Sequence, residues 1–142
     1  MMQPITVAIV HQDPAVRAAC ERLLRNERDI IVMASTDVDI VAAIVRSKPH
    51  IVLSSLALMC ADQECALLLT LRRTCQATCV VLLADSPVQE DLLLHALAIG
   101  ACGYLAHDAI EHHLARAVHG VDRGEAWVPR KMLGKIMDMV LR

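Results

Sequence analysis

Short apolar runs alternate with segments of helical periodicity along the whole sequence, and this alternation restricts the possible folds more than any other feature. The apolar runs are continuous and rich in Ile, Val and Leu, which is typical of strands that are buried on both faces of a parallel sheet. The predicted strands are Ile5–Val10, Ile30–Met33, Ile51–Ser54, Cys79–Leu83 and Cys102–Leu105. The sequence therefore predicts a parallel sheet with helices on both faces.

The segments between these strands carry start and stop signals of helices. Asp13 and Pro14 supply an N-cap and a first-turn proline. Later helices are predicted over Asp37–Arg46, over Asp62–Arg73, from Pro87 to Gly100, from Asp108 as N-cap, and over Arg130–Leu141. A (βα)5 chain of this kind predicts a doubly wound, flavodoxin-like α/β sheet of order 2-1-3-4-5. We expect this unit to occupy residues 1–123 and a C-terminal linker helix to occupy residues 124–142.

Length and charge exclude several classes of protein. The 142 residues suffice for one domain with its own core. A net charge of −2 gives no basic field, so we expect no direct DNA contact by this segment. Met1–Pro4 leads straight into the first strand without a signal peptide. The apolar stretch Leu92–Ala106 is shorter than the ~18 residues of a membrane span, so a cytoplasmic protein is expected.

Six cysteines stand at positions 20, 60, 65, 75, 79 and 102. Without a secretory signal we expect all of them to be reduced. The spacings of Cys60 with Cys65 and of Cys75 with Cys79 do not form a zinc-type pair of pairs, and we expect no metal and no cofactor. Cys60, Cys65 and Cys75 lie in a less apolar context than the others, so they stay open as accessible thiols.

Four segments resemble, in order and spacing, the receiver domains of NarL/FixJ-type (LuxR-type) response regulators. They are Ile5–Val10 with Pro14 and Arg17, Lys48–Leu53, Gly100–Leu105, and Gly124–Trp127. The run Gly-Ala-Cys-Gly-Tyr-Leu at 100–105 is the most specific of them. The resemblance implies the same doubly wound fold and a role in signal transduction and transcription regulation.

The resemblance also implies where a phosphorylation pocket would lie. In the family, two acidic residues after the first strand hold Mg²⁺, an aspartate ending the third strand accepts phosphate, and a strand-four hydroxyl and a strand-five lysine contact it. The corresponding positions here, with Asp13 beside them, are His11, Gln12, Ser55, Leu83 and His107. All five have changed, and without carboxylates Mg²⁺ loses its charged ligands. We therefore expect a pseudo-receiver with no catalytic residue and no aspartyl phosphate. The switch aromatic of the family corresponds to Tyr104, which is retained.

A second hypothesis is that the vacated pocket binds a different signal in place of phosphate. The predicted fold brings His11 and His107 together near Asp13, and such a cluster could bind a transition metal. A stand-alone metal, redox or ligand sensor is thus the alternative to a regulatory domain.

Helices that are apolar on more than one face predict self-association. The candidate dimer or partner surface comprises Leu92, Leu93, Leu94, Leu97, Met132, Ile136 and Met139. Related receivers dimerise, and most continue past the linker helix, which would end here at Arg142, into a DNA-binding helix-turn-helix domain. The expected partners are a second copy, another regulatory protein, or such a domain, with no membrane contact.

Overall fold

The computed structural model describes residues 3–141, and its sheet has the predicted order and direction. Five parallel strands are hydrogen-bonded in the order β2-β1-β3-β4-β5. They are β1 (Ile5–Val10), β2 (Ile30–Thr36), β3 (Ile51–Ser55), β4 (Cys79–Ala84) and β5 (Gly103–Ala106). The flavodoxin-like fold is confirmed. β2 continues to Thr36, beyond the expected Met33, because its last residues still pair with the end of β1.

The helices alternate with these strands. They are α1 (Pro14–Arg25), α2 (Ile40–Ser47), α3 (Leu56–Met59), α4 (Ala66–Thr74), α5 (Glu90–Ile99), the 3-10 helix η1 (His107–Ala109), α6 (Ile110–Asp122) and α7 (Arg130–Leu141). The carboxylate of Asp13 caps α1 as expected, accepting from the Ala15 N–H at 2.9 Å. The expected cap at Asp108 is wrong, because the chain leaves β5 through η1 and Asp108 lies inside that turn.

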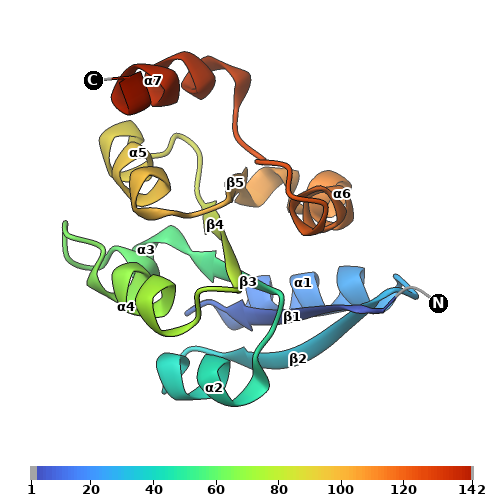
Figure 1. Cartoon of the computed structure of the whole chain (residues 1–142). Helices are drawn as coiled ribbons and strands as arrows, with labels where there is room; N and C mark the ends of the chain where they lie inside the picture. The colour runs from blue at the N-terminus through green and yellow to red at the C-terminus, as the bar shows by residue number, and fades with distance from the viewer. Residues whose placement is uncertain (1–2, 142) are drawn as a thin grey trace.

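Helices cover both faces of the sheet. Figure 1 shows α2, α3, α4 and α5 on one side and α1 and α6 on the other. Successive strand residues therefore point into two separate cores. Ala8, Val10 and Val52 belong to the first core, whereas Val7, Ile9 and Leu53 belong to the second. Burial on both sides explains why the strands read as continuous apolar runs. Within residues 3–141 no helix is long and apolar enough to cross a bilayer.

The register of the sheet aligns the carboxyl ends of its inner strands. Val10 of β1 pairs with Ser54, and the next residue of β3, Ser55, pairs with Leu83 of β4. Leu83 pairs in turn with Leu105 of β5. Residues that follow these pairs therefore emerge at one edge of the sheet, where the first polar side chains stand.

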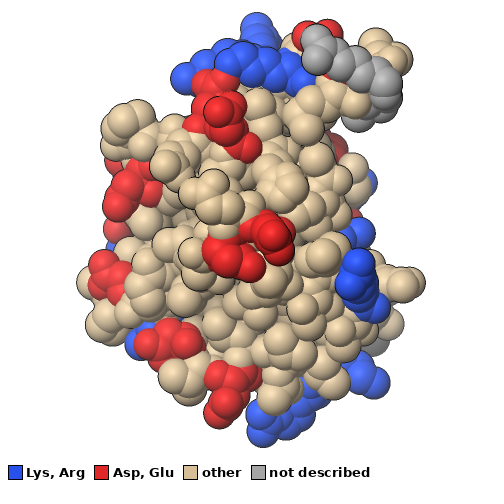
Figure 2. Space-filling view, turned by 90° about the vertical axis from the view of Figure 1, so that its left-hand side faces the viewer, with Lys and Arg blue, Asp and Glu red and all other residues tan. Residues whose placement is uncertain are grey.

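The C-terminal helix α7 folds back onto α5. Met132 is 1% exposed and belongs to the same core as α5, and Lys135 forms an ion pair with Glu90 at the start of α5. Figure 2 shows Lys and Arg side chains at the top of this face, where α7 lies, above acidic side chains. One apolar face of α7 is thus covered within the chain, while Met137, at 54% exposure, points away from the core.

The packing of α7 predicts unequal costs for two matched truncations. Met132→Ala removes a fully buried side chain and should lower the free energy of unfolding by about 2–5 kcal/mol. Met137→Ala, five residues further along and on the other face of the same helix, should change it by less than about 0.5 kcal/mol. Equilibrium denaturation in urea measures both. Equal effects would contradict the packing of α7 on α5.

Candidate functional site

The positions that correspond to a phosphorylation pocket lie together at the carboxyl edge of the sheet. His11 follows β1 directly, Ser55 ends β3, Leu83 lies near the end of β4, and His107 follows β5. β1 and β5 are not neighbours in the sheet, so His11 and His107 meet by reaching over the ends of β3 and β4. The predicted convergence of these residues is therefore present.

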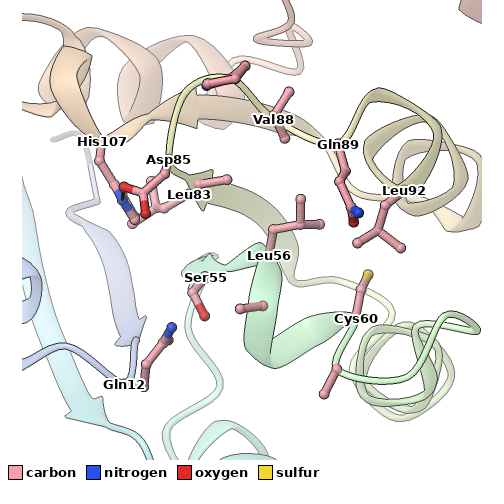
Figure 3. Close-up of a pocket in the computed structure, with 14 residues that line it drawn as sticks. Gln12, Ser55, Leu56, Cys60, Leu83, Asp85, Val88, Gln89, Leu92 and His107 are labelled. Carbon is pink, nitrogen blue, oxygen red and sulfur yellow. Dashed lines mark hydrogen bonds and ion pairs between the residues drawn. The ribbon is translucent and has the colours of Figure 1, made fainter.

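A cavity of about 380 Å³ opens at this edge. Figure 3 shows Gln12, Ser55, Asp85 and His107 at one end of it and Leu56, Val88 and Leu92 towards the other. Leu83 and Cys60 also line it, whereas His11 and Asp13 do not. The site is thus a pocket of mixed polar and apolar lining, with His107, the hydrogen-bond partner of His11, at one end.

Three hydrogen bonds join the Asp13 backbone, the two histidine rings and the Asp85 carboxylate in one chain. The Asp13 N–H donates to Nδ1 of His11 at 2.9 Å. The two Nε2 atoms of His11 and His107 are 3.0 Å apart, and Nδ1 of His107 lies 2.7 Å from an Asp85 carboxylate oxygen. His11 is only 2% exposed, whereas the Asp85 side chain is 91% exposed. The chain of bonds runs from the protein interior to the surface.

These contacts determine the tautomers of both neutral rings. Nδ1 of His11 accepts a hydrogen bond, so the single proton of that ring is on Nε2. That proton points at Nε2 of His107, which must accept it, so the proton of His107 is on Nδ1. Nδ1 of His107 then donates to Asp85. Each ring nitrogen of the pair thus has one hydrogen-bond partner and acts either as a donor or as an acceptor.

The surroundings oppose a positive charge on His11. Burial lowers its pKa, and the neighbouring His107 and the Arg17 guanidinium lower it further, against the opposite effects of Asp13 and Asp85. Arg17 approaches because its guanidinium donates to the backbone carbonyl of His11. His11 is therefore held neutral to a lower pH than an ordinary histidine.

The same bonds disfavour the metal site considered as an alternative. A histidine binds a metal through an unprotonated ring nitrogen. Nε2 of His11 carries a proton, and its Nδ1 lone pair is taken by the Asp13 N–H. The Asp13 carboxylate caps α1, and the carboxylate that contacts the pair is Asp85. The donor set suits hydrogen bonding better than transition-metal binding.

Ser55, at the position of the phosphoacceptor, has a structural contact. Its hydroxyl oxygen accepts from the Leu58 N–H at 3.0 Å and caps α3. Sequence reasoning missed this short helix, although a serine after a strand is a typical N-cap. The side chain is 2% exposed and faces the cavity floor.

Tyr104, at the position of the family's switch aromatic, is 7% exposed and packs in the core that contains α5. Burial raises the pKa of its hydroxyl, and Asp108 and Asp85 add to that effect. Its backbone N–H donates to the Trp127 carbonyl at 2.7 Å. These contacts make the ring part of the packed end of the sheet.

The expectation of six reduced thiols is wrong for one pair. Cys60 and Cys65 form a disulfide, and the thiols of Cys20, Cys75, Cys79 and Cys102 are free. The reason is local: α3 ends before Cys60, and Cys65, with a φ of 55°, turns the chain back before α4. This reversal brings the two sulfur atoms together beside the cavity.

The residues of the candidate dimer surface differ in how deeply they are buried. Leu93 and Met132 are fully buried, so their assignment to a surface is wrong: each faces the core shared by α5 and α7. Leu92, Leu94, Leu97 and Ile136 are partly buried against that core, and Met139 is 44% exposed. Sequence periodicity could not reveal that α7 itself covers α5.

Asp85 is the site residue that sequence reasoning missed. It follows β4 immediately, at the same edge as His11 and His107. The rule that the carboxyl ends of parallel strands form the site could have found it, since it is the first acidic residue after the strand.

Comparisons with known proteins support the fold. No protein-family model matches the sequence, and no curated protein is similar enough to count as a relative.

Solved structures do match. The isolated receiver domain of RcsB from Salmonella enterica serovar Typhimurium in the apo form is similar with a TM-score of 0.82 and 14% identity, over 94% of this chain and 98% of that one. A two-component response regulator of the LuxR family from Aurantimonas sp. SI85-9A1 has a TM-score of 0.80 and 18% identity, over 99% and 100% of the two chains. RcsB, in a structure of two dimers bound to two parallel DNAs, has a TM-score of 0.80 and 14% identity, over 94% and 68%. The chain thus has the fold of response-regulator receiver domains.

The lowered pKa of His11 predicts how stability depends on pH. Below the ordinary histidine pKa of about 6.5 the unfolded chain binds a proton at this position that the folded chain does not, so stability falls as the pH decreases. The contribution is complete above that pH and is lost down to the lowered pKa of the folded state. Its slope cannot exceed about 1.4 kcal/mol per pH unit, the limit for one proton.

Urea denaturation at a series of pH values between 8 and 5 measures this slope. His11→Gln should flatten it, whatever its effect on absolute stability. His95→Gln, at an exposed position on α5, should leave the slope intact. An unchanged slope in the His11 variant would contradict the burial of a neutral histidine.

Proposed function

We propose that the chain is a phosphorylation-independent receiver-like domain that acts in signal transduction and transcription regulation through contacts with other proteins. In this proposal residues 1–123 form the receiver-like unit and residues 124–142 its linker helix. The receiver fold supports the general role. The observation that carries the loss of phosphorylation is the set of hydrogen bonds at the pocket.

Two of the replaced positions are already engaged. The Ser55 hydroxyl accepts from the Leu58 N–H, and Nε2 of His107 accepts from His11. Leu83 offers no hydroxyl, and Gln12 and His11 offer no carboxylate for Mg²⁺. Phosphoryl transfer depends on positioned cations and a nucleophilic carboxylate, and these positions supply neither. The domain is therefore not an enzyme and is not phosphorylated on aspartate.

The contact surface in this proposal is the outer face of α7. Leu133, Met137 and Leu141 are 46%, 54% and 78% exposed and stand four residues apart, so they form one stripe along the helix. An exposed apolar stripe of this kind marks an interaction site. A second copy fits it, because the exposed stripe of one helix can pack against the same stripe of another across a twofold axis. RcsB, which has a similar fold, forms dimers on DNA, and a DNA-binding domain is a further partner of the proposed module.

The first test concerns phosphate. Incubation with Mg²⁺ and acetyl phosphate, or with beryllofluoride, should leave the mass, the amide spectrum and the melting temperature unchanged. Ser55→Asp should not restore a response, because aspartate can still cap α3 while the Mg²⁺ ligands remain missing. A receiver that retains its acceptor aspartate serves as the positive control. A Mg²⁺-dependent shift in this protein would refute phosphorylation independence.

The second test concerns dimerisation. Sedimentation at micromolar concentration should show a homodimer, and Met137→Glu should weaken it at least tenfold without loss of helical content, because a charge enters the apolar stripe. Ile31→Glu, on β2 at the opposite edge of the sheet and 46% exposed, is the matched control and should not affect it. Dissociation by both variants, or by neither, would exclude the α7 stripe as the interface.

A further inference from the structure

The hydrogen bonds of the histidine pair leave no position for another proton. From the Asp13 N–H to the Asp85 carboxylate every donor already faces an acceptor. A proton added to Nδ1 of His11 would face the Asp13 N–H. A proton added to Nε2 of His107 would face the N–H of His11. Either addition replaces an attraction with two opposed N–H groups, so the closed pair exists only when both rings are neutral.

The charged groups around the pair favour one outcome of protonation. Around His11 stand Asp13 and Arg17 from the start of α1, and Arg17 lies 3.9 Å from Asp37 after β2. His107 and Asp85 face it from the ends of β5 and β4. Arg17 disfavours a cation on buried His11, whereas His107 is partly exposed and touches the Asp85 carboxylate. The charge is best accommodated on His107.

A charged His107 must leave His11. Its Nδ1–H still donates to the Asp85 carboxylate. Its Nε2–H needs a new acceptor, and a water molecule can be that acceptor because the side chain is 23% exposed. Both His107 and Asp85 line the cavity, and His107 opens η1, which leads into α6. Asp85 opens the segment that leads into α5, on which α7 packs. Separation of the two rings therefore shifts the loops that lead into α5 and α6.

We propose that the ligand of this site is a proton: the His11–His107 pair is a pH-sensing centre whose protonation separates the rings, opens the polar end of the cavity and shifts the loops after β4 and β5. This rests on the proposed function only in assigning the receiver-like domain an input that replaces phosphate. The chemistry of the pair stands on its own geometry.

Long-range ¹⁵N–¹H NMR of the histidine rings in the full chain tests the closed state. At pH 8 His11 should show the Nε2–H tautomer and His107 the Nδ1–H tautomer. The opposite tautomer in either ring would overturn the proposal, because the hydrogen-bond chain would then run differently.

Acidification tests the switch. Between pH 8 and 5 the amides within residues 85–89 and 107–110 should shift together with the ring signals of the pair. The protection factors for hydrogen exchange in both segments, which correct for the slower intrinsic exchange at low pH, should fall at least fivefold. His107→Gln is the decisive variant, since a glutamine oxygen can accept from His11 without ever taking a charge. It should keep both segments in their pH 8 state at pH 5. His95→Gln is the control and should behave as the wild type.

The outcomes separate this proposal from the proposed function. If the two histidines titrate independently and the loops do not move, the pH-sensing centre is refuted, while insensitivity to beryllofluoride would leave phosphorylation independence standing. If the pair titrates as described but beryllofluoride shifts the spectrum, the centre is supported and phosphorylation independence fails. Loop shifts that persist unchanged in His107→Gln would also refute the centre.

Discussion

Burial of the sheet on both faces is the constraint on which the other features of this protein depend. Val52 and Leu53 are consecutive residues of β3 yet belong to different cores, and neither is accessible to solvent. A strand with two buried faces has no room for polar chemistry, so functional side chains can stand only where the strands end. The parallel arrangement then places His11, Ser55, Asp85 and His107 at a single edge.

The polar side chains at this edge of the sheet form specific hydrogen bonds. Ser55 caps a helix, and each histidine ring satisfies the other. Buried polar groups without partners are costly, and the hydrogen bonds among these side chains avoid that cost. The resulting pair is stable only in one protonation state. This dependence on protonation state is the basis of the proposed pH-sensing centre.

Helix α7 covers an apolar surface of α5 and exposes an apolar surface of its own. The excess apolar side chains of α5 are covered by Met132 and Ile136 of α7, within the same chain. Covering α5 leaves the opposite stripe of α7 exposed at Leu133, Met137 and Leu141. The apolar surface that the composition predicts is therefore present, but it lies one helix further from the sheet. Lys135 and Glu90 fix the position of α7 on α5.

The sequence by itself determined the strand order and the edge of the sheet at which the pocket lies. Those conclusions rest on local periodicity and on motifs such as Gly100–Leu105, which keep their meaning without knowledge of distant contacts. Only the tertiary structure decided which atoms meet. His11 and His107, which meet in the structure, are 96 residues apart in the sequence, and Asp85 contacts His107 from the end of a third strand. The apolar face of α5 is covered by α7 of the same chain. Hydrogen-bond direction and burial depend on side-chain positions to within an ångström or so, and residue spacing along the chain does not specify them. The disulfide between Cys60 and Cys65 belongs to the same class, because it depends on the reversal of the chain after α3 and not on the number of residues between the cysteines.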